Sequence, residues 1–188
     1  MIDLAIDGTD LTKARKVLES LGDKARPILA KALNRAARGI PTDASKFTRR
    51  TYNVKARQVK ESFTVQHANR NDLMAYAQSK GSPISLYRFG ARPRHPGGRR
   101  PKQGVSVKVM DVRKKIPGSF VAAPKGGIGI FRRKGSSRLP IKKLYGPSVP
   151  QMVDNVDAIP EIENGAEERF SKNLEHEIDY TLSKMGLR

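Results

Sequence analysis

The clearest hydrophobic pattern lies near the C-terminus, where apolar residues recur at every fourth position. These residues are Ile162, Ala166, Phe170, Leu174, Ile178 and Leu182. The spacing predicts an amphipathic helix from Pro160 to Met185. Glu161 and Glu163 suit the positive end of the helix dipole, and Gly186 can terminate the helix.

The N-terminal part changes from a period of two to a helical period. Apolar residues alternate over Ile2–Ile6, which predicts a short strand ending at the turn Asp7-Gly8. A helix is predicted next, capped by Thr9 and ended by Gly22. Its apolar face is formed by Leu11, Ala14, Leu18 and Leu21.

A second helix is predicted from about Asp23, with a buried stripe formed by Ile28, Ala32, Leu33 and Ala36. Gly39-Ile40-Pro41 should break or kink this helix, because proline lacks a backbone donor and its ring clashes with the preceding turn. Helical structure should resume from Thr42 to Arg50. Asn53 is the expected N-cap of a further helix, Val54–Ser62.

The middle of the chain returns to strand patterns. Phe63–Ala68 and Leu73–Gln78 predict a hairpin with a tight turn at residues 69–72. Further strands are expected at Ile84–Phe89, Val105–Met110, Ser119–Ala122 and Ile128–Phe131. Prolines punctuate Leu139–Val156, which favours an extended connection with at most a short helix.

Residues 90–104 form a loop with four glycines, three prolines and five basic residues. This composition cannot pack a core, so we expect a mobile arm; a second flexible basic stretch is expected at residues 132–138. The whole chain, residues 1–188, is predicted to be one α+β domain. A small, mainly antiparallel sheet packs with N-terminal helices and a long C-terminal helix, and long basic loops extend from it.

Charge is distributed unevenly along the chain, whose net charge is +19. Residues 81–143 contain 17 Lys and Arg residues and one acidic residue, Asp111, whereas residues 144–188 contain 4 basic and 9 acidic residues. Solubility alone could explain a basic surface. Concentration in two loops instead favours an anionic partner, either nucleic acid or an acidic protein ring. The candidate binding residues are Arg92, Arg94, Arg99, Arg100, Lys102, Arg132, Arg133, Lys134, Arg138, Lys142 and Lys143.

Catalytic and metal-binding patterns are missing from the sequence. The chain has no cysteine, and its three histidines show no metal-ligand spacing. Glu175-His176-Glu177 looks like a catalytic trio, but neighbours on a helix face different ways, so a solvated helix face is expected. The acids of the C-terminal helix spread over several faces, and we expect no cofactor, metal or catalytic residue.

Two other features have ordinary structural interpretations. Residues 126–129 contain three glycines without phosphate-loop spacing and are predicted to be strand glycines. Tyr87, Phe89, Phe120, Phe131 and Tyr145 could stack nucleobases, but their alternation favours a core role. No apolar run approaches the roughly 18 residues of a membrane span, and the N-terminus lacks a secretory pattern, so we expect a protein made in a cytoplasm.

Four segments, taken in order, point to a known family: Lys31–Arg38, Tyr52–Arg57, Ser85–Phe89 and, most specific, Arg138–Met152. Together they resemble the minor tail protein Z family of tailed bacteriophages and prophages. The resemblance covers the chain from the second helix to the C-terminal helix.

The resemblance implies a structural virion protein that completes the head-proximal end of a long tail and supports head–tail joining. It implies no enzyme activity. The expected partners are other tail and neck proteins, further copies in a ring, and the phage DNA near the junction. The expected location is the virion, after assembly in the host cytoplasm. One alternative is a sequence-independent nucleic-acid-binding protein of chromatin or ribosome type. A metal nuclease would need clustered acids.

Overall fold

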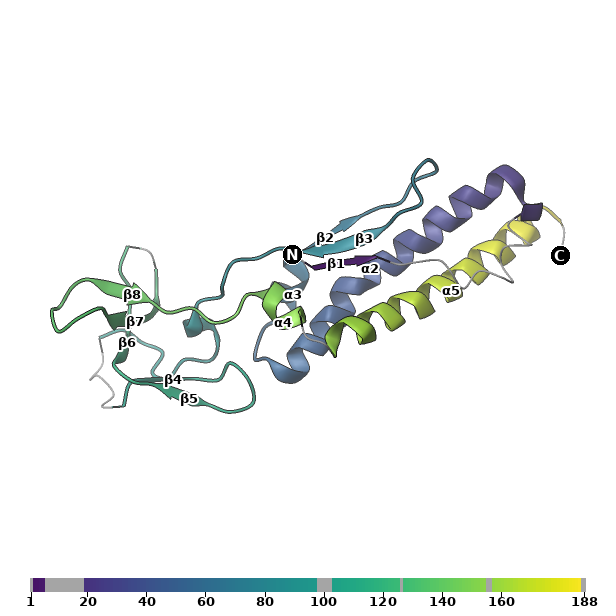
Figure 1. Cartoon of the computed structure of the whole chain (residues 1–188). Helices are drawn as coiled ribbons and strands as arrows, with labels where there is room; N and C mark the ends of the chain where they lie inside the picture. Colours follow the sequence, from purple (N-terminus) through teal and green to yellow (C-terminus); the bar gives the residue numbers. More distant parts are fainter. Residues whose placement is uncertain (1, 6–18, 98–102, 126, 155–156, 187–188) are drawn as a thin grey trace.

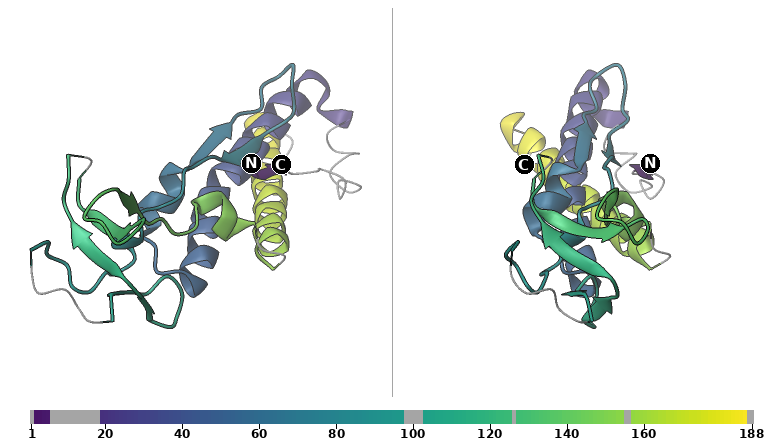
Figure 2. Two further views of the ribbon diagram at one scale, coloured as in Figure 1. Left: turned by 60° about the vertical axis from the view of Figure 1, so that its left-hand side comes forward. Right: turned by 90° about the vertical axis from the view of Figure 1, so that its left-hand side faces the viewer.

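The computed structural model describes residues 2–5, 19–97, 103–125, 127–154 and 157–186 of an elongated molecule. Two long helices lie side by side at one end, and short strands form the other end (Figures 1 and 2). The predicted α+β class is confirmed, but the strands form three separate small antiparallel sheets in place of one.

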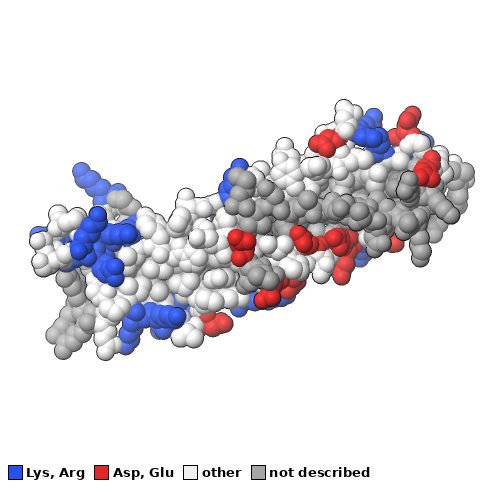
Figure 3. Space-filling view, in the orientation of Figure 1, with Lys and Arg blue, Asp and Glu red and all other residues white. Residues whose placement is uncertain are grey.

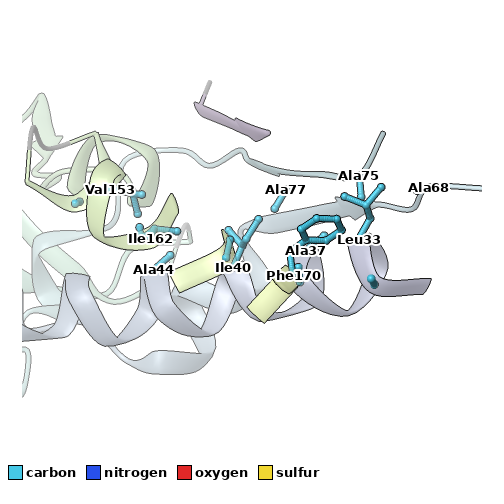
Figure 4. Packing of buried hydrophobic residues seen from close by; sticks show 14 of the residues in the cluster. Leu33, Ala37, Ile40, Ala44, Ala68, Ala75, Ala77, Val153, Ile162 and Phe170 are labelled. Atoms are coloured by element: carbon cyan, nitrogen blue, oxygen red, sulfur yellow. The ribbon is translucent and has the colours of Figure 1, made fainter. Parts of the chain in front are cut away.

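The helix α5 (Ala158–Lys184) confirms the four-residue pattern, and it packs along α2 (Ala25–Thr51). The predicted stripe of α2 is buried. Figure 4 shows Phe170 of α5 close to Leu33 and Ala37 of α2. Small residues on α2, including Ala36 with 0% exposure, allow the two backbones to come close. This helix pair forms most of the larger hydrophobic core.

Of the break or kink predicted at Gly39-Ile40-Pro41, the break is wrong, because α2 continues through these residues as one helix of 27 residues. Packing explains this result. Ile40 is fully buried in the core, so contacts with the neighbouring elements hold this part of α2 in a helical conformation. The guanidinium of Arg169 lies over Gly39, in space that a Cβ would fill. Its Nη1 donates a hydrogen bond to the carbonyl of Ala36 at 3.0 Å.

Asn53 is not a helix cap, which corrects another prediction. The helix α3 (Ala56–Glu61) begins after Lys55, and Asn53 lies in the extended segment that follows α2. Its backbone N–H donates to the carbonyl of Val109 at 2.9 Å. This bond ties the end of α2 to the strand region, so tertiary pairing holds Asn53 where a cap was expected.

The first sheet has the order β1-β3-β2 and contains β1 (Ile2–Ala5), β2 (Phe63–Gln66) and β3 (Tyr76–Ser79). The predicted N-terminal strand and hairpin are confirmed, although β2 and β3 are shorter than expected. The Asn69 side chain accepts hydrogen bonds from the backbone of Asn71 and Asp72 and so closes the predicted turn. Ala77 of β3 is buried toward the helices (Figure 4).

The other two sheets lie at the opposite end of the molecule. One pairs β4 (Val105–Val107) with β5 (Lys114–Ile116), and the other has the order β6-β7-β8. Its strands are β6 (Ser119–Ala122), β7 (Gly129–Arg133) and β8 (Ile141–Lys143). The strands predicted around β4, β6 and β7 are confirmed, whereas β5 and β8 were not predicted.

The strand predicted at Ile84–Phe89 is wrong. Ser85 makes only an isolated bridge with Tyr145, and the 3₁₀ helix η2 (Leu86–Arg88) follows it. This turn places Phe89, which is 1% exposed, in the larger core. Burial of the Phe89 ring therefore stabilises the turn more than the apolar alternation favours a strand.

Three remaining segments complete the comparison with the sequence. The helix α4 (Val149–Val153) is the short helix expected within the proline-rich connection. The 3₁₀ helix η1 (Gly22–Lys24) precedes α2, and Gly22 has a φ of 52°. The N-terminal helix expected from Thr9 to Gly22 lies mostly outside the described residues, apart from its last turn at residues 19–20.

A small second core lies among the short strands. It contains Ala91, Val105, Val107, Val121 and Ile130. Ala91 is 1% exposed, so the loop 90–104 does contribute to a core, contrary to prediction. Its neighbour Arg92 exchanges two backbone hydrogen bonds with Ser106, both at 2.9 Å. This pairing anchors the start of the loop to β4.

Candidate functional site

Basic residues gather at the strand end of the molecule, which we call the cationic end (residues 81–143). Figure 3 shows mainly blue side chains at this end, and red and blue side chains together over the helices. We call the rest, comprising β1–β3, α2, α3, α4 and α5, the helical end. The two ends differ in how their charges are neutralised.

Charges in the helical end form ion pairs between α2 and α5. Glu177 of α5 is 4% exposed and lies 2.9 Å from Arg35 and 3.5 Å from Lys31 of α2. Glu161 of α5 pairs with Arg50 of α2 at 2.7 Å. The expectation that the acids of α5 are merely solvated is therefore wrong for Glu177, which the approach of α2 buries.

A further ion pair joins Arg169 of α5 to Asp43 of α2. Burial between the helices lowers the pKa of the Arg169 guanidinium from its ordinary value. Two acids of the C-terminal part of the chain, Glu161 and Glu177, thus serve the contact between the two helices. They fix α5 on α2 and offset positive charges of α2.

The cationic end contains a single acid, Asp111, so its basic residues find other neighbours. Arg113 Nη1 donates to the carbonyl of Gly90 at 2.8 Å and to that of Ser106 at 3.2 Å. Arg113 thereby holds the 90–97 segment against β4. It has a structural role that the sequence did not indicate.

The β6-β7-β8 sheet places two predicted binding residues directly opposite one another. Arg132 of β7 pairs in register with Lys142 of β8, and both are exposed. Cβ atoms of directly opposed residues lie about 5 Å apart, and like charges at this spacing are destabilising. The arrangement therefore does not serve folding, and it leaves two exposed positive charges on neighbouring strands.

The next residue of each strand points to the other face of the same sheet. There the guanidinium of Arg133 lies 5.9 Å from the Phe120 ring centroid, and its Nη1 donates to the Ser137 carbonyl at 3.0 Å. The ammonium of Lys143 lies 6.0 Å from the Tyr145 ring centroid. Because Arg132 and Arg133 belong to β7, the flexible stretch predicted at 132–138 is wrong for these two residues.

The other candidate residues lie in loops. Arg92 and Arg94 are exposed, and the Arg94 carbonyl accepts a hydrogen bond from the Tyr87 hydroxyl at 2.9 Å. Lys134 and Arg138 are exposed between β7 and β8. The three remaining candidates, Arg99, Arg100 and Lys102, lie outside the described residues.

The aromatic and glycine predictions have mixed outcomes. Phe89 and Phe131 are buried as expected, but Tyr145 is 54% exposed. Gly129 is a strand glycine as predicted, and a Cβ there would lie 2.8 Å from Lys143 Cε. Gly127 instead occupies a turn, with a φ of 83°.

The search for metal and membrane features covers only the residues that the structure describes. Within them, no group of three or more His, Cys, Asp or Glu side chains could hold a metal ion. No helix in the described ranges is both long and apolar enough to cross a bilayer.

Comparison with known proteins gives one family. Residues 9–187 match the family described as prophage minor tail protein Z (GPZ). No curated protein and no solved structure matches the chain. The matched residues include α2 and α5 of the helical end and all strands of the cationic end, so the family match covers both ends of the molecule.

Proposed function

The chain belongs to the prophage minor tail protein Z family, and from this premise we propose that it completes the head-proximal end of a long tail and supports head–tail joining. The family consists of structural, non-enzymatic phage proteins, so this chain is a component of the virion tail with other tail proteins as partners. We propose further that it acts as a ring whose cationic end faces an acidic protein surface or DNA.

The opposed Arg132 and Lys142 are the observation that most supports this proposal. Their repulsion costs folding free energy, and the single acid of residues 81–143 cannot offset the charge of that whole region. An anionic partner removes this repulsion on binding. The family membership favours a tail role over an independent protein of chromatin or ribosome type.

Charge reversal tests the proposal in assembled particles. Arg132→Glu combined with Lys142→Glu should leave the fold intact, because both side chains are exposed, and should reduce the yield of infectious particles about 100-fold or more. The matched control is Arg38→Glu with Arg49→Glu, an equal change of charge on exposed positions of α2. Normal infectivity of the first variant would sink the assignment.

A second measurement separates the two possible partners of the cationic end. Tight binding of the purified protein to a DNA duplex, falling steeply from 50 to 200 mM salt, would identify phosphates as the partner. Negligible DNA binding near physiological salt would identify an acidic protein surface. The same two double variants should be compared, because only the Arg132 and Lys142 changes should alter binding to the partner.

A further inference from the structure

A cavity of about 560 Å³ lies beside β8, and Lys143 is one of its lining residues. Because successive strand residues point to opposite faces, this cavity and the Arg132–Lys142 pair use different faces of the sheet. The cavity is closed on its other side by the segment 82–88, which precedes the loop 90–97. Backbone hydrogen bonds of Ile84 with Gly146 and Pro147 hold this segment in place.

Two cations make the cavity attractive to an anion. Arg88 is exposed at its lining, and the Lys143 stem is positioned over Gly129. The Tyr145 ring, 6.0 Å from the Lys143 ammonium, restricts that side chain further. Asp111, the single acid of the cationic end, is not among the lining residues. The local field is therefore positive.

The Ser85 hydroxyl is not part of the binding surface. Ser85 lines the cavity, but its Oγ is buried and therefore closed off from anything that the cavity holds. The contacts to an anion would come from Arg88 and Lys143, which carry the positive charge of the lining.

The remaining lining distinguishes a peptide from a nucleic acid. Pro83, Ile84 and Ile128 supply an apolar wall next to the cations. A phosphodiester backbone would neutralise the cations but leave this wall in contact with water, whereas an acidic residue beside an apolar residue would use both parts. We propose that the cavity binds an acidic side chain and a neighbouring apolar side chain of a protein partner. The inference rests on the proposed function only in taking this partner to be a tail protein.

Binding of a small probe to the purified full chain tests the proposal by NMR. N-acetyl-Leu-Glu-amide should shift the backbone amide resonances of Ser85, Ile128 and Lys143 saturably, with a Kd of about 1 mM for so small a ligand. Lys143→Gln should raise the Kd about fivefold, as expected for one charge-assisted contact. The matched control Lys142→Gln, an equal change on the other face of the same strand, should alter it less than about twofold.

Ser85→Ala provides a second control that keeps the fold. Removing a hydroxyl that is closed off from the cavity should leave Tm unchanged or higher, and should alter the Kd less than about twofold. The whole proposal fails if the three resonances show no saturable shift, or if Lys142→Gln weakens binding as much as Lys143→Gln.

Inorganic phosphate and a short DNA duplex serve as competing probes. If either moves the same resonances at lower concentration than the dipeptide, the site recognises phosphate and the peptide proposal is wrong. Failure here is distinguishable from failure of the proposed function. Normal infectivity of the Arg132→Glu/Lys142→Glu variant would contradict the proposed function alone. It would leave the cavity proposal untouched, because Arg132 and Lys142 lie on the other face of the sheet.

Discussion

The helical end and the cationic end use charged residues in opposite ways. In the helical end, Glu177 and Glu161 of α5 meet Arg35 and Arg50 of α2, so opposite charges hold two helices together. In the cationic end, basic side chains meet carbonyls, aromatic rings or, at the Arg132–Lys142 pair, one another. The charges of the first region stabilise the fold, whereas the opposed Arg132 and Lys142 of the second do not, and we propose that they meet a partner.

The two ends also differ in the size of their hydrophobic cores. The larger core lies between α2, α5, α4 and the first sheet, and it includes large side chains such as Phe170 and Met152. The smaller core consists of five buried residues around β4, β6 and β7. Most of the folding free energy should therefore come from the helical end, whereas the cationic end should tolerate changes of its surface.

Removing a large side chain from the helical core should produce the largest effect on stability. Phe170→Ala should lower the free energy of unfolding by about 3–5 kcal/mol, because the ring is 5% exposed and leaves a cavity between α5 and α2. Urea denaturation measures the change. The control is Val112→Ala at an exposed position of the cationic end, with an expected loss below about 1 kcal/mol. Equal losses would contradict the assignment of stability to the helical end.

An intermediate effect is expected from the buried ion pair. Glu177→Gln should destabilise the protein by about 1–3 kcal/mol, because Arg35 and Lys31 lose the carboxylate that they approach on α5. Glu175→Gln is the matched control, since Glu175 is exposed on the same helix and should change stability by less than about 0.5 kcal/mol. If the two variants unfold alike in urea, Glu177 has no special role in the helix contact.

The smallest effect has the opposite sign. Lys142→Glu replaces a like-charged cross-strand pair with Arg132 by an attractive one, and should stabilise the protein by about 0.2–1 kcal/mol. Lys134→Glu, in the loop after β7, should stabilise it less. A lower urea midpoint for Lys142→Glu would show that the opposed cations are not under repulsion, and would remove the main argument for an assembly surface.

The sequence predicts the helical end well where a single periodic apolar face packs on one other helix. The spacing of Ile162 to Ile178 identified α5, and the stripe Ile28 to Ala36 identified the buried face of α2. The rule against proline within a helix failed at Pro41, because burial of the neighbouring turns on α5 outweighs the local cost. Glu177 could not be recognised as buried, since its partners lie on another helix.

The cationic end shows where prediction from sequence stops. Its charge is evident from composition. Six of its candidate residues are exposed, namely Arg92, Arg94, Arg132, Lys134, Arg138 and Lys142. Yet β8 is only three residues long, and it becomes a strand by pairing with β7. The opposition of Arg132 and Lys142 depends on that register. The cavity beside Lys143 depends on the segment 82–88, which overlaps the strand wrongly predicted at Ile84–Phe89.

Binding to isolated tails tests the central claim, that the cationic end is an assembly surface, most directly. Tails assembled without this protein would be mixed with purified protein and sedimented. The wild type and the Arg38→Glu/Arg49→Glu variant should sediment with the tails, and Arg132→Glu/Lys142→Glu should remain in the supernatant. Equal sedimentation of both double variants would contradict the claim, because it would show that the tail does not contact the opposed cations.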